Sequence, residues 1–302
     1  MSVNFRPNIP NLLVLIKPCQ FGFNKETKES NHFQKSIKIE NLTYKVSNEF
    51  EGVVTILLKN NIAIKVFEDR PSTYTPDAIF LNNWISHLPN GLVTVFPMLA
   101  KNRQQEVRED IIDYFIEWGR ADKLIDLTKE VRNNRFLEGT GSIVFDHFRK
   151  EAYACLSERT NLELLKEYCS EIGYCSIPFI SKDENDLSIY HTNVMLSITE
   201  KYILVCLDSI IDSSINLYLQ KSNKVVIPIS QNQVKNFAGN VIEVLDKDGR
   251  SCLIMSETAY TIFTDSQLGI ISSFSKIICV NVATIEKIGG GGIRCMLAGL
   301  FV

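Results

Sequence analysis

Apolar strand-like runs and amphipathic helical runs recur along this chain in one order: a β-hairpin, a helix and a single strand. The order returns about every fifty residues, as at 137–145 and 151–156, which precede a helix at 161–172. Repeats of this kind are typical of toroidal architectures, in which each unit packs on its neighbours and distant loops meet at one central mouth. The repeat therefore predicts an α/β propeller with a central site.

The other expected elements follow the same alternation. Helices are expected at residues 48–60, 103–118, 213–220 and 265–274, and strands at 62–67, 77–85, 92–98, 189–198, 201–207, 240–245, 251–255, 284–288 and 296–301. No low-complexity tract and no linker rich in Pro, Gly or Ser divides the sequence. We therefore expect a single domain over residues 1–302.

Composition and charge narrow the class of protein. Hydrophobic residues make up 45% of the 302 residues and charged residues 22%, as in ordinary soluble domains. The net charge of −3 argues against a nucleic-acid partner, which requires a basic surface. No signal peptide is evident, and apolar runs such as 202–207 are too short to span a bilayer. We expect a cytoplasmic protein without membrane or nucleic-acid partners, and homo-oligomerisation stays open.

The chain contains eight cysteines but no Cys-x-x-Cys pair, and only four histidines. Several cysteines lie in apolar runs, for example Cys155 and Cys279, as reduced core cysteines do. The spacing does not fit a zinc site, so we expect neither a metal nor an organic cofactor.

One cysteine differs from the others, because Cys295 follows four consecutive glycines at 289–292. Glycines in a strand-like segment mark a close approach by a ligand or by another backbone. Arg294 beside this thiol would favour the thiolate, which is the nucleophilic form. A buried structural cysteine behind a flexible turn is the alternative interpretation.

Three further polar clusters could complete a nucleophilic site. His191 and Asn193 are expected on one face of a strand, because side chains alternate with period two. Glu138 precedes a Gly-x-Gly bend, and Asn82 and Asn83 interrupt another apolar run. A thiol needs a base or acid, and an imidazole needs an orienting partner. These residues supply those parts, although each also fits a structural role: a satisfied strand histidine, a turn carboxylate, or turn-forming amides.

A series of short motifs runs in order along nearly the whole chain. They are Lys17-Pro18 with Phe21-Gly22-Phe23-Asn24, Pro76-Asp77-Ala78-Ile79-Phe80 with Asn82-Asn83-Trp84, Leu137-Glu138-Gly139-Thr140-Gly141-Ser142, Ser157-Glu158-Arg159-Thr160, Tyr190-His191-Thr192-Asn193-Val194, Gln233 with Phe237-Ala238-Gly239-Asn240, and residues 289–296. Together they resemble the guanidino-group-modifying enzymes, or pentein superfamily, which includes arginine deiminases, dimethylarginine hydrolases and amidinotransferases. Within it the chain looks most similar to the citrulline-utilisation hydrolase branch, an amidinotransferase-like group.

The resemblance implies a five-bladed pentein propeller with the active site in its central cavity. It implies that Cys295 is the nucleophile, His191 the general acid and base, and Glu138 the carboxylate that orients the histidine. Arg159 and Arg103 stand where related deiminases bind the α-carboxylate of the substrate, a role that suits the guanidinium fork. Arg103 also fits the description of an ordinary solvent-facing residue at a helix start.

The chain departs from the arginine deiminases at two positions. Those enzymes carry carboxylates where this chain has Asn83 and Asn193. Two carboxylates suit a cationic guanidinium, whereas two amides suit a neutral group, to which they can both donate and accept hydrogen bonds. With Asn82 beside them, these amides predict a pocket for an uncharged ureido group such as that of citrulline. The expected reaction is hydrolysis to ornithine, ammonia and carbon dioxide through a covalent Cys295 intermediate.

Two rival functions are weighed against this one. An arginine deiminase or amidinotransferase would need another acid, for which Asp77 or Asp146 is available. A non-catalytic propeller would predict that Cys295 resists iodoacetamide near neutral pH. Relatives also usually have an acidic residue near position 299 and a slightly longer tail, whereas this chain ends at Gly299-Leu300-Phe301-Val302.

Overall fold

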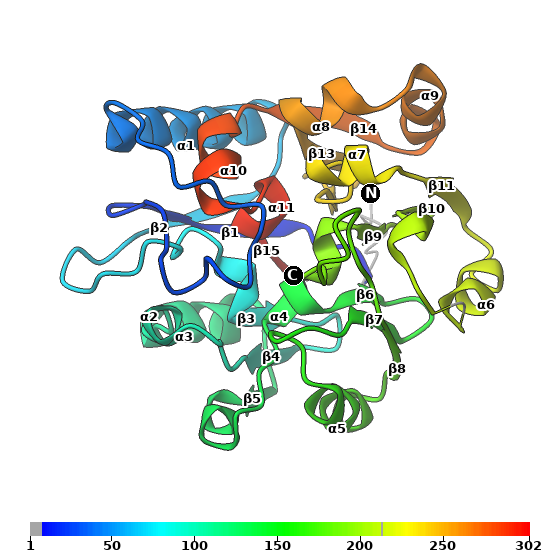
Figure 1. Cartoon of the computed structure of the whole chain (residues 1–302), viewed down its shortest axis with the longest axis horizontal. Helices are drawn as coiled ribbons and strands as arrows, with labels where there is room; N and C mark the ends of the chain where they lie inside the picture. Colours follow the sequence, from blue (N-terminus) through cyan, green and yellow to red (C-terminus); the bar gives the residue numbers. More distant parts are fainter. Residues whose placement is uncertain (1–7, 213) are drawn as a thin grey trace.

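A computed structural model describes residues 8–212 and 214–302. Within these residues, five three-stranded sheets are arranged as a ring, and helices line its outside (Figure 1). This confirms the predicted pentein propeller. None of the described helices is long and apolar enough to cross a membrane.

Four of the sheets combine an antiparallel hairpin with a third strand that runs parallel to the hairpin's second strand. In chain order the first four are β3 (Ile85–His87), β4 (Leu92–Val95) and β5 (Lys123–Asp126); β6 (Val144–Asp146), β7 (Glu151–Cys155) and β8 (Cys175–Phe179); β9 (Leu196–Ile198), β10 (Tyr202–Val205) and β11 (Val225–Pro228); and β12 (Ile242–Leu245), β13 (Ser251–Ser256) and β14 (Lys276–Val280).

The fifth sheet joins the two ends of the chain and closes the ring. Strand β15 (Ala298–Leu300) pairs antiparallel with β1 (Leu12–Lys17), which pairs in parallel with β2 (Ile64–Glu68). The side-chain amide of Asn11 donates to the Val302 carbonyl at 2.7 Å and accepts from the Val302 amide at 2.8 Å. The last residues are therefore a structural part of a blade.

Helices connect the parallel strands, as parallel pairing requires. They are α1 (Leu42–Lys59), α3 (Glu109–Trp118), α5 (Leu162–Ile172), α6 (Ser214–Gln220), and α8 (Glu257–Ile262) with α9 (Asp265–Phe274). The short helices α2 (Lys101–Gln104) and α7 (Gln231–Lys235) follow β4 and β11. Asn161 caps α5, and Ser230 and Thr264 form capping boxes at α7 and α9.

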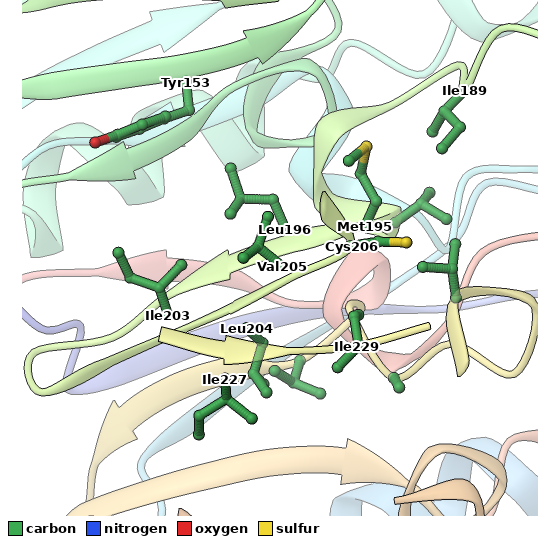
Figure 2. Packing of buried hydrophobic residues seen from close by; sticks show 14 of the residues in the cluster. Tyr153, Ile189, Met195, Leu196, Ile203, Leu204, Val205, Cys206, Ile227 and Ile229 are labelled. Atoms are coloured by element: carbon green, nitrogen blue, oxygen red, sulfur yellow. The ribbon is translucent and has the colours of Figure 1, made fainter. Parts of the chain in front are cut away.

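The apolar middle strands form the core between the blades. All side chains of β10 are buried, and they pack with β9, β11 and the helices that follow (Figure 2). Burial on both faces explains why this strand reads as a continuous apolar run. Each such Leu, Ile or Val contributes about 1.5–3 kcal/mol through loss of apolar surface from water.

Several sequence predictions are wrong where single helical turns replace strand. Residues 77–85 form a turn and the 3₁₀ helix η1 (Leu81–Asn83); 137–145 contain the one-turn helix α4 (Gly139–Ser142); 189–198 contain η3 (Thr192–Val194); and 284–288 lie in helix α10 (Ala283–Gly289). In α10, Ile285 and Ile288 are buried at helical spacing, and Glu49 accepts from the amides of Thr284 and Ile285 at its start. The predicted helix at 103–118 is interrupted, because α2 ends at Gln104 and α3 begins at Glu109. Residue 213, where a further helix was predicted to begin, lies outside the described residues.

Candidate active site

The one-turn helices lie immediately before the inner strands, and they meet at the centre of the ring. Helix α4 contacts both η1 and η3, and α11 (Ile293–Met296) contacts η1. Glu138 and His191 occupy the N-cap positions immediately before α4 and η3, and Asn83 and Asn193 lie within η1 and η3. Because four of the blades carry such a turn before the inner strand, residues over 200 apart in the chain form one cluster with Cys295.

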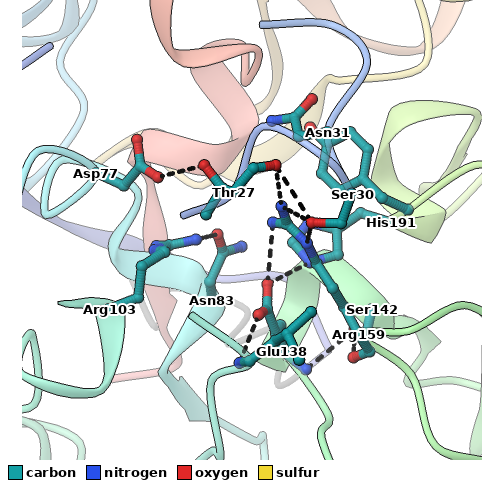
Figure 3. Close-up of polar contacts among 12 residues, drawn as sticks. Thr27, Ser30, Asn31, Asp77, Asn83, Arg103, Glu138, Ser142, Arg159 and His191 are labelled. Atoms are coloured by element: carbon teal, nitrogen blue, oxygen red, sulfur yellow. Dashed lines mark hydrogen bonds and ion pairs between the residues drawn. The ribbon is translucent and has the colours of Figure 1, made fainter. Parts of the chain in front are cut away.

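Glu138 orients His191 in this cluster (Figure 3). The Nε2 of His191 lies 2.8 Å from Oε2 of Glu138, and both side chains are buried. The backbone amide of Leu99 donates to Oε1 of Glu138 at 3.0 Å, and Arg159 Nη1 lies 3.3 Å from Oε2. This contact set holds a proton on Nε2 and leaves Nδ1 as the nitrogen that can exchange a proton.

The charges fix the protonation of this pair. Burial alone would raise the pKa of Glu138, but Arg159, the His191 hydrogen bond and Arg103 outweigh it and hold that pKa well below its usual range. Burial lowers the pKa of His191 to about 4, against the opposing effect of Glu138. At neutral pH the cluster therefore holds a carboxylate beside a neutral imidazole.

Two side-chain amides contact the sulfur of Cys295. Nδ2 of Asn240 lies 3.3 Å from Sγ and Nδ2 of Asn193 lies 3.5 Å from it. Burial raises the pKa of this thiol, although Asn240, Arg294 and Asn193 oppose the shift. The sequence argument that Arg294 favours the thiolate has the correct sign, but desolvation is the larger effect. Cys295 is therefore a thiol in the free protein.

The glycines are required by close packing, as the sequence indicated, although the segment joins helices α10 and α11 and is not a strand. A Cβ on Gly289 or Gly291 would lie 2.6 or 2.9 Å from the ring of Phe80. Gly141 has the same role beside the imidazole, because its Cβ would lie 2.7 Å from Nδ1 of His191. Real Cβ atoms do not approach other atoms so closely. These positions therefore let the backbone lie directly against the site.

The predicted binding amides and Arg103 are already engaged with one another. Asn83 donates to Oδ1 of Asn82 at 2.9 Å and accepts from Nη1 of Arg103 at 2.8 Å, and Asn82 donates to Thr140 at 3.1 Å. Nε and Nη2 of Arg103 each lie 2.9 Å from a carboxylate oxygen of Glu106. A substrate carboxylate at Arg103 would have to compete with this buried bidentate pair. The substrate-binding role of Arg103 stays a prediction.

Arg159 links the site to the loop between β1 and α1. Its guanidinium lies 2.7 Å from Ser30 Oγ through Nη2 and 3.4 Å from the Thr27 carbonyl, and it stacks over Tyr190 at 4.8 Å (Figure 3). The same loop reaches Asp77, whose Oδ2 accepts from Asn24 at 2.7 Å. The loop thereby lies against the guanidinium that contacts Glu138, and the substrate-binding role of Arg159 stays a prediction.

Two residues of the cluster were not predicted for the proposed site, and one of them, Asp77, was named only as a substitute acid for the arginine rival. Asn240 contacts the sulfur, and its Oδ1 accepts from the amide of Arg294 at 3.1 Å, so it positions the whole Cys295 turn. Asp77 is fully buried, and its Oδ1 has no hydrogen-bond partner among the described residues. Both lie in motifs that the sequence singled out, but only their contacts reveal what they touch. Asp146, the other acid proposed from the sequence, lies 2.9 Å from Lys224 instead.

Comparison with known proteins agrees with this description. Five mixed sheets around a central cluster of thiol, imidazole and carboxylate define the pentein superfamily of guanidino-group-modifying enzymes. The family model described as eukaryotic N,N-dimethylarginine dimethylhydrolase matches residues 17–302, and the chain belongs to this family. It is thus of the guanidino-modifying hydrolase type. No curated protein matches the sequence.

Solved structures share the fold at low sequence identity. The chain is 15% identical to cyanobacterial ArgZ, an arginine dihydrolase, with a TM-score of 0.74; the match covers 96% of this chain but 40% of ArgZ. A cysteine-to-serine mutant of the N-terminal domain of ArgZ, bound to substrate, is 14% identical with a TM-score of 0.72, and the match covers 96% and 97% of the two chains. A dimethylarginine hydrolase mutant from Pseudomonas aeruginosa, complexed with citrulline, is 15% identical with a TM-score of 0.68, covering 96% and 99%.

Proposed function

We propose that this chain hydrolyses the ureido group of L-citrulline to ornithine, ammonia and carbon dioxide. The observation that carries the proposal is the amide environment of the nucleophile: Asn193 and Asn240 contact Sγ of Cys295, and no carboxylate does so among the described residues. Amides can donate to the ureido oxygen and accept from its nitrogens. A cationic guanidinium at the sulfur would meet these amides instead of carboxylates, which would offset less of its desolvation cost.

The first half of the proposed reaction generates the nucleophile at the moment of use. His191 Nδ1 removes the proton from Cys295, and Sγ forms a bond to the ureido carbon. The amides of Asn193 and Asn240 stabilise the developing oxyanion. The resulting imidazolium is stabilised by Glu138 and then protonates the departing δ-nitrogen. The C–N bond breaks, ornithine leaves, and a carbamoyl group remains on sulfur.

The second half restores the enzyme. Neutral His191 takes a proton from water, whose oxygen attacks the carbamoyl carbon, and the C–S bond breaks to return the thiol. The carbamic acid released decomposes to ammonia and carbon dioxide. Citrulline and one water molecule therefore give ornithine, ammonia and carbon dioxide, with no change of oxidation state and no group carrier.

Arginine is the second candidate substrate, and Asp77 is the observation in its favour. This buried carboxylate keeps one oxygen without a partner among the described residues, so it could pair with a cationic part of a substrate. Burial raises the pKa of Asp77, and Arg103 opposes the shift, so a cationic ligand would stabilise its charged form. The arginine dihydrolase ArgZ also has this fold. An α-ammonium group would satisfy Asp77 equally well, and that group is present in both citrulline and arginine.

A substrate panel tests the proposal. Purified protein is incubated with L-citrulline, L-arginine or N,N-dimethylarginine, and ammonia and ornithine are quantified. We expect citrulline to have the highest kcat/KM and to give equal amounts of ornithine and ammonia, and Cys295→Ala to abolish turnover. Full activity in that variant, or activity on arginine alone, would refute the assignment. Turnover is a better criterion than iodoacetamide labelling, since burial and the raised pKa of Cys295 make slow labelling the expected result for an enzyme as well.

A further inference from the structure

A pocket, which we call the chamber, lies on the ring axis behind the candidate catalytic cluster. It has a volume of about 110 Å³, and the inner strands β3, β6, β9, β12 and β15 all contribute to its wall. Its end nearest the active site is formed by Thr140, Asn193 and Arg294, which belong to α4, η3 and α11. Asn193 contacts the sulfur of Cys295, and Thr140 contacts Asn82. One layer of side chains therefore separates the chamber from the catalytic cluster.

Arg294 brings an unmatched positive charge to this chamber. Its Nη1 donates to the Leu297 carbonyl at 2.9 Å, and no carboxylate lies within ion-pair distance of it in the described part of the chain. Burial lowers the pKa of Arg294 to about 10, which reflects the cost of holding this charge away from water. The other basic group of the chamber, Lys224, is already paired with Asp146 at 2.9 Å.

His147 adds a neutral donor to the same chamber. Its Nδ1 lies 2.9 Å from the Tyr174 hydroxyl, and when that hydroxyl donates, Nε2 carries the proton. Burial, with Lys224 and Arg294, lowers the pKa of His147 to about 3, so the ring is neutral at pH 7. The three acidic residues in the wall are paired. Asp146 lies 2.9 Å from Lys224, and Glu200 lies 3.1 Å from Lys201. Glu243 accepts from the Ser251 hydroxyl at 2.6 Å and from the Glu200 backbone amide at 2.7 Å.

We propose that this chamber is a binding site for a small planar oxyanion, held by the guanidinium of Arg294 with His147 as a second donor. A fork of guanidinium donors matches two oxygens of such an anion. The volume accommodates an anion of about four heavy atoms, since a water molecule takes about 30 Å³ of liquid volume. The identity of the anion rests on the proposed function: hydration of the carbon dioxide released gives bicarbonate, which has this shape and charge.

A bound anion would also act on catalysis from behind the nucleophile. The charge of Arg294 favours the thiolate of Cys295, so an anion that offsets this charge would make the thiolate harder to form. The anion does not occupy the place of the amino acid. Bicarbonate should therefore lower kcat without raising KM for the amino acid substrate.

Anion titration of the full chain tests the site. The melting temperature is followed against bicarbonate, nitrate and chloride at constant ionic strength, in wild type, Arg294→Gln and Arg250→Gln. Arg250 is the matched control because its side chain is 75% exposed. We expect saturable stabilisation of wild type by bicarbonate and nitrate, an apparent Kd at least tenfold weaker in Arg294→Gln, and no change in Arg250→Gln.

These binding measurements test the anion site without any measurement of catalysis. A melting temperature that does not saturate up to about 50 mM bicarbonate in wild type, or equal affinities in wild type and Arg294→Gln, would overturn it. A response to nitrate without one to bicarbonate would overturn the assignment to the product. If Arg294→Gln fails to fold, Arg294→Lys keeps the charge but removes the fork, and His147→Phe removes the second donor; weaker binding is expected in both. Inactivity towards citrulline would refute the proposed function but leave these binding results intact.

Discussion

Replacing Glu138 by glutamine tests whether the carboxylate is needed to hold the imidazole of His191 in the proposed tautomer, because the variant retains the imidazole itself. The carboxylate accepts from His191 through Oε2 and from the Leu99 amide through Oε1. A glutamine of the same shape has one acceptor oxygen. If that oxygen keeps its hydrogen bond to the Leu99 amide, the NH₂ group of the glutamine faces the Nε2 proton of His191 and the guanidinium of Arg159. Hydrogen-bond donors then face one another without an acceptor. The imidazole must then move its proton to Nδ1, where the proposed base needs a lone pair.

The structure sets the size of both effects. Removing one partner of a buried charge pair costs about 3–5 kcal/mol, and we expect the lower end because Arg159 retains Ser30 and the Tyr190 ring. A histidine in the wrong tautomer lowers kcat by about 10⁴-fold in the serine-protease triad, so we expect a loss of about 10³–10⁴-fold here. The folded-state pKa of Glu138 lies below its ordinary 4.5, so its stabilisation is present above pH 4.5 and is lost as pH falls below it.

Steady-state kinetics with citrulline and urea unfolding at pH 7 and pH 4 measure these quantities. Glu163→Gln is the matched control, because its carboxylate is exposed and lies 3.2 Å from Lys166 in a surface pair. The stability difference between Glu138→Gln and wild type should shrink at the lower pH. A kcat within tenfold of wild type in the folded variant would refute the orienting role of this carboxylate.

Three further perturbations test other parts of the site. Gly141→Ala places a Cβ 2.7 Å from the His191 ring and should lower kcat at least a hundredfold while the protein still folds; a near-normal kcat would show that the ring can move aside. Asn193→Asp puts a negative charge beside the Cys295 sulfur, so the ratio of kcat/KM for arginine to that for citrulline should rise at least tenfold; an unchanged ratio would contradict the neutral-pocket argument. His147 has a folded-state pKa of about 3 against 6.5 in the unfolded chain, so its protonation destabilises the wild-type protein as the pH falls below 6.5. In His147→Phe, the loss of unfolding free energy between pH 7 and pH 5, measured with urea, should therefore be smaller by about 2 kcal/mol. An equal loss in both proteins would count against a neutral His147 ring.

The architecture and the grouping of the principal candidate residues could be predicted because their signals are repeated or ordered along the chain. The hairpin–helix–strand order recurs in four blades, so errors in single elements do not change the architecture. Glu138, His191 and Cys295 lie in motifs whose order alone indicates the superfamily. Their mutual placement then follows from the fold, since each precedes an inner strand of its blade.

The single helical turns could not be distinguished from strand. Over three residues, as in η1 or η3, alternation with period two and helical spacing give the same apolar pattern. Tertiary contacts decide, because these turns direct Asn83 and Asn193 into the ring. The sequence argument for His191 and Asn193 on one strand face was wrong for this reason.

The contacts of Arg103 show a second limit of prediction from sequence motifs. Glu106 lies three residues after Arg103, a spacing that brings two side chains together on a helix. The resemblance to the deiminases assigned Arg103 to substrate binding, but it did not take the nearby carboxylate of Glu106 into account. The protonation of Cys295 likewise depends on burial, which motifs do not encode. Contacts within the fold therefore add the charge states that a motif leaves open.

The distribution of charge in the cluster links these charge states to the proposed chemistry. Apart from Arg294, which neighbours Cys295 in the chain, the formal charges lie on the side of Glu138, Arg159 and Arg103, and two side-chain amides contact the sulfur. A resting thiolate would be costly there, because two amides compensate a desolvated anion incompletely. A thiol beside a neutral imidazole carries no charge, and Glu138 stabilises the imidazolium once the proton has moved. A neutral ureido group can enter such a site without requiring any charge to be neutralised first, and the proton that creates the nucleophile is then the one delivered to the leaving nitrogen.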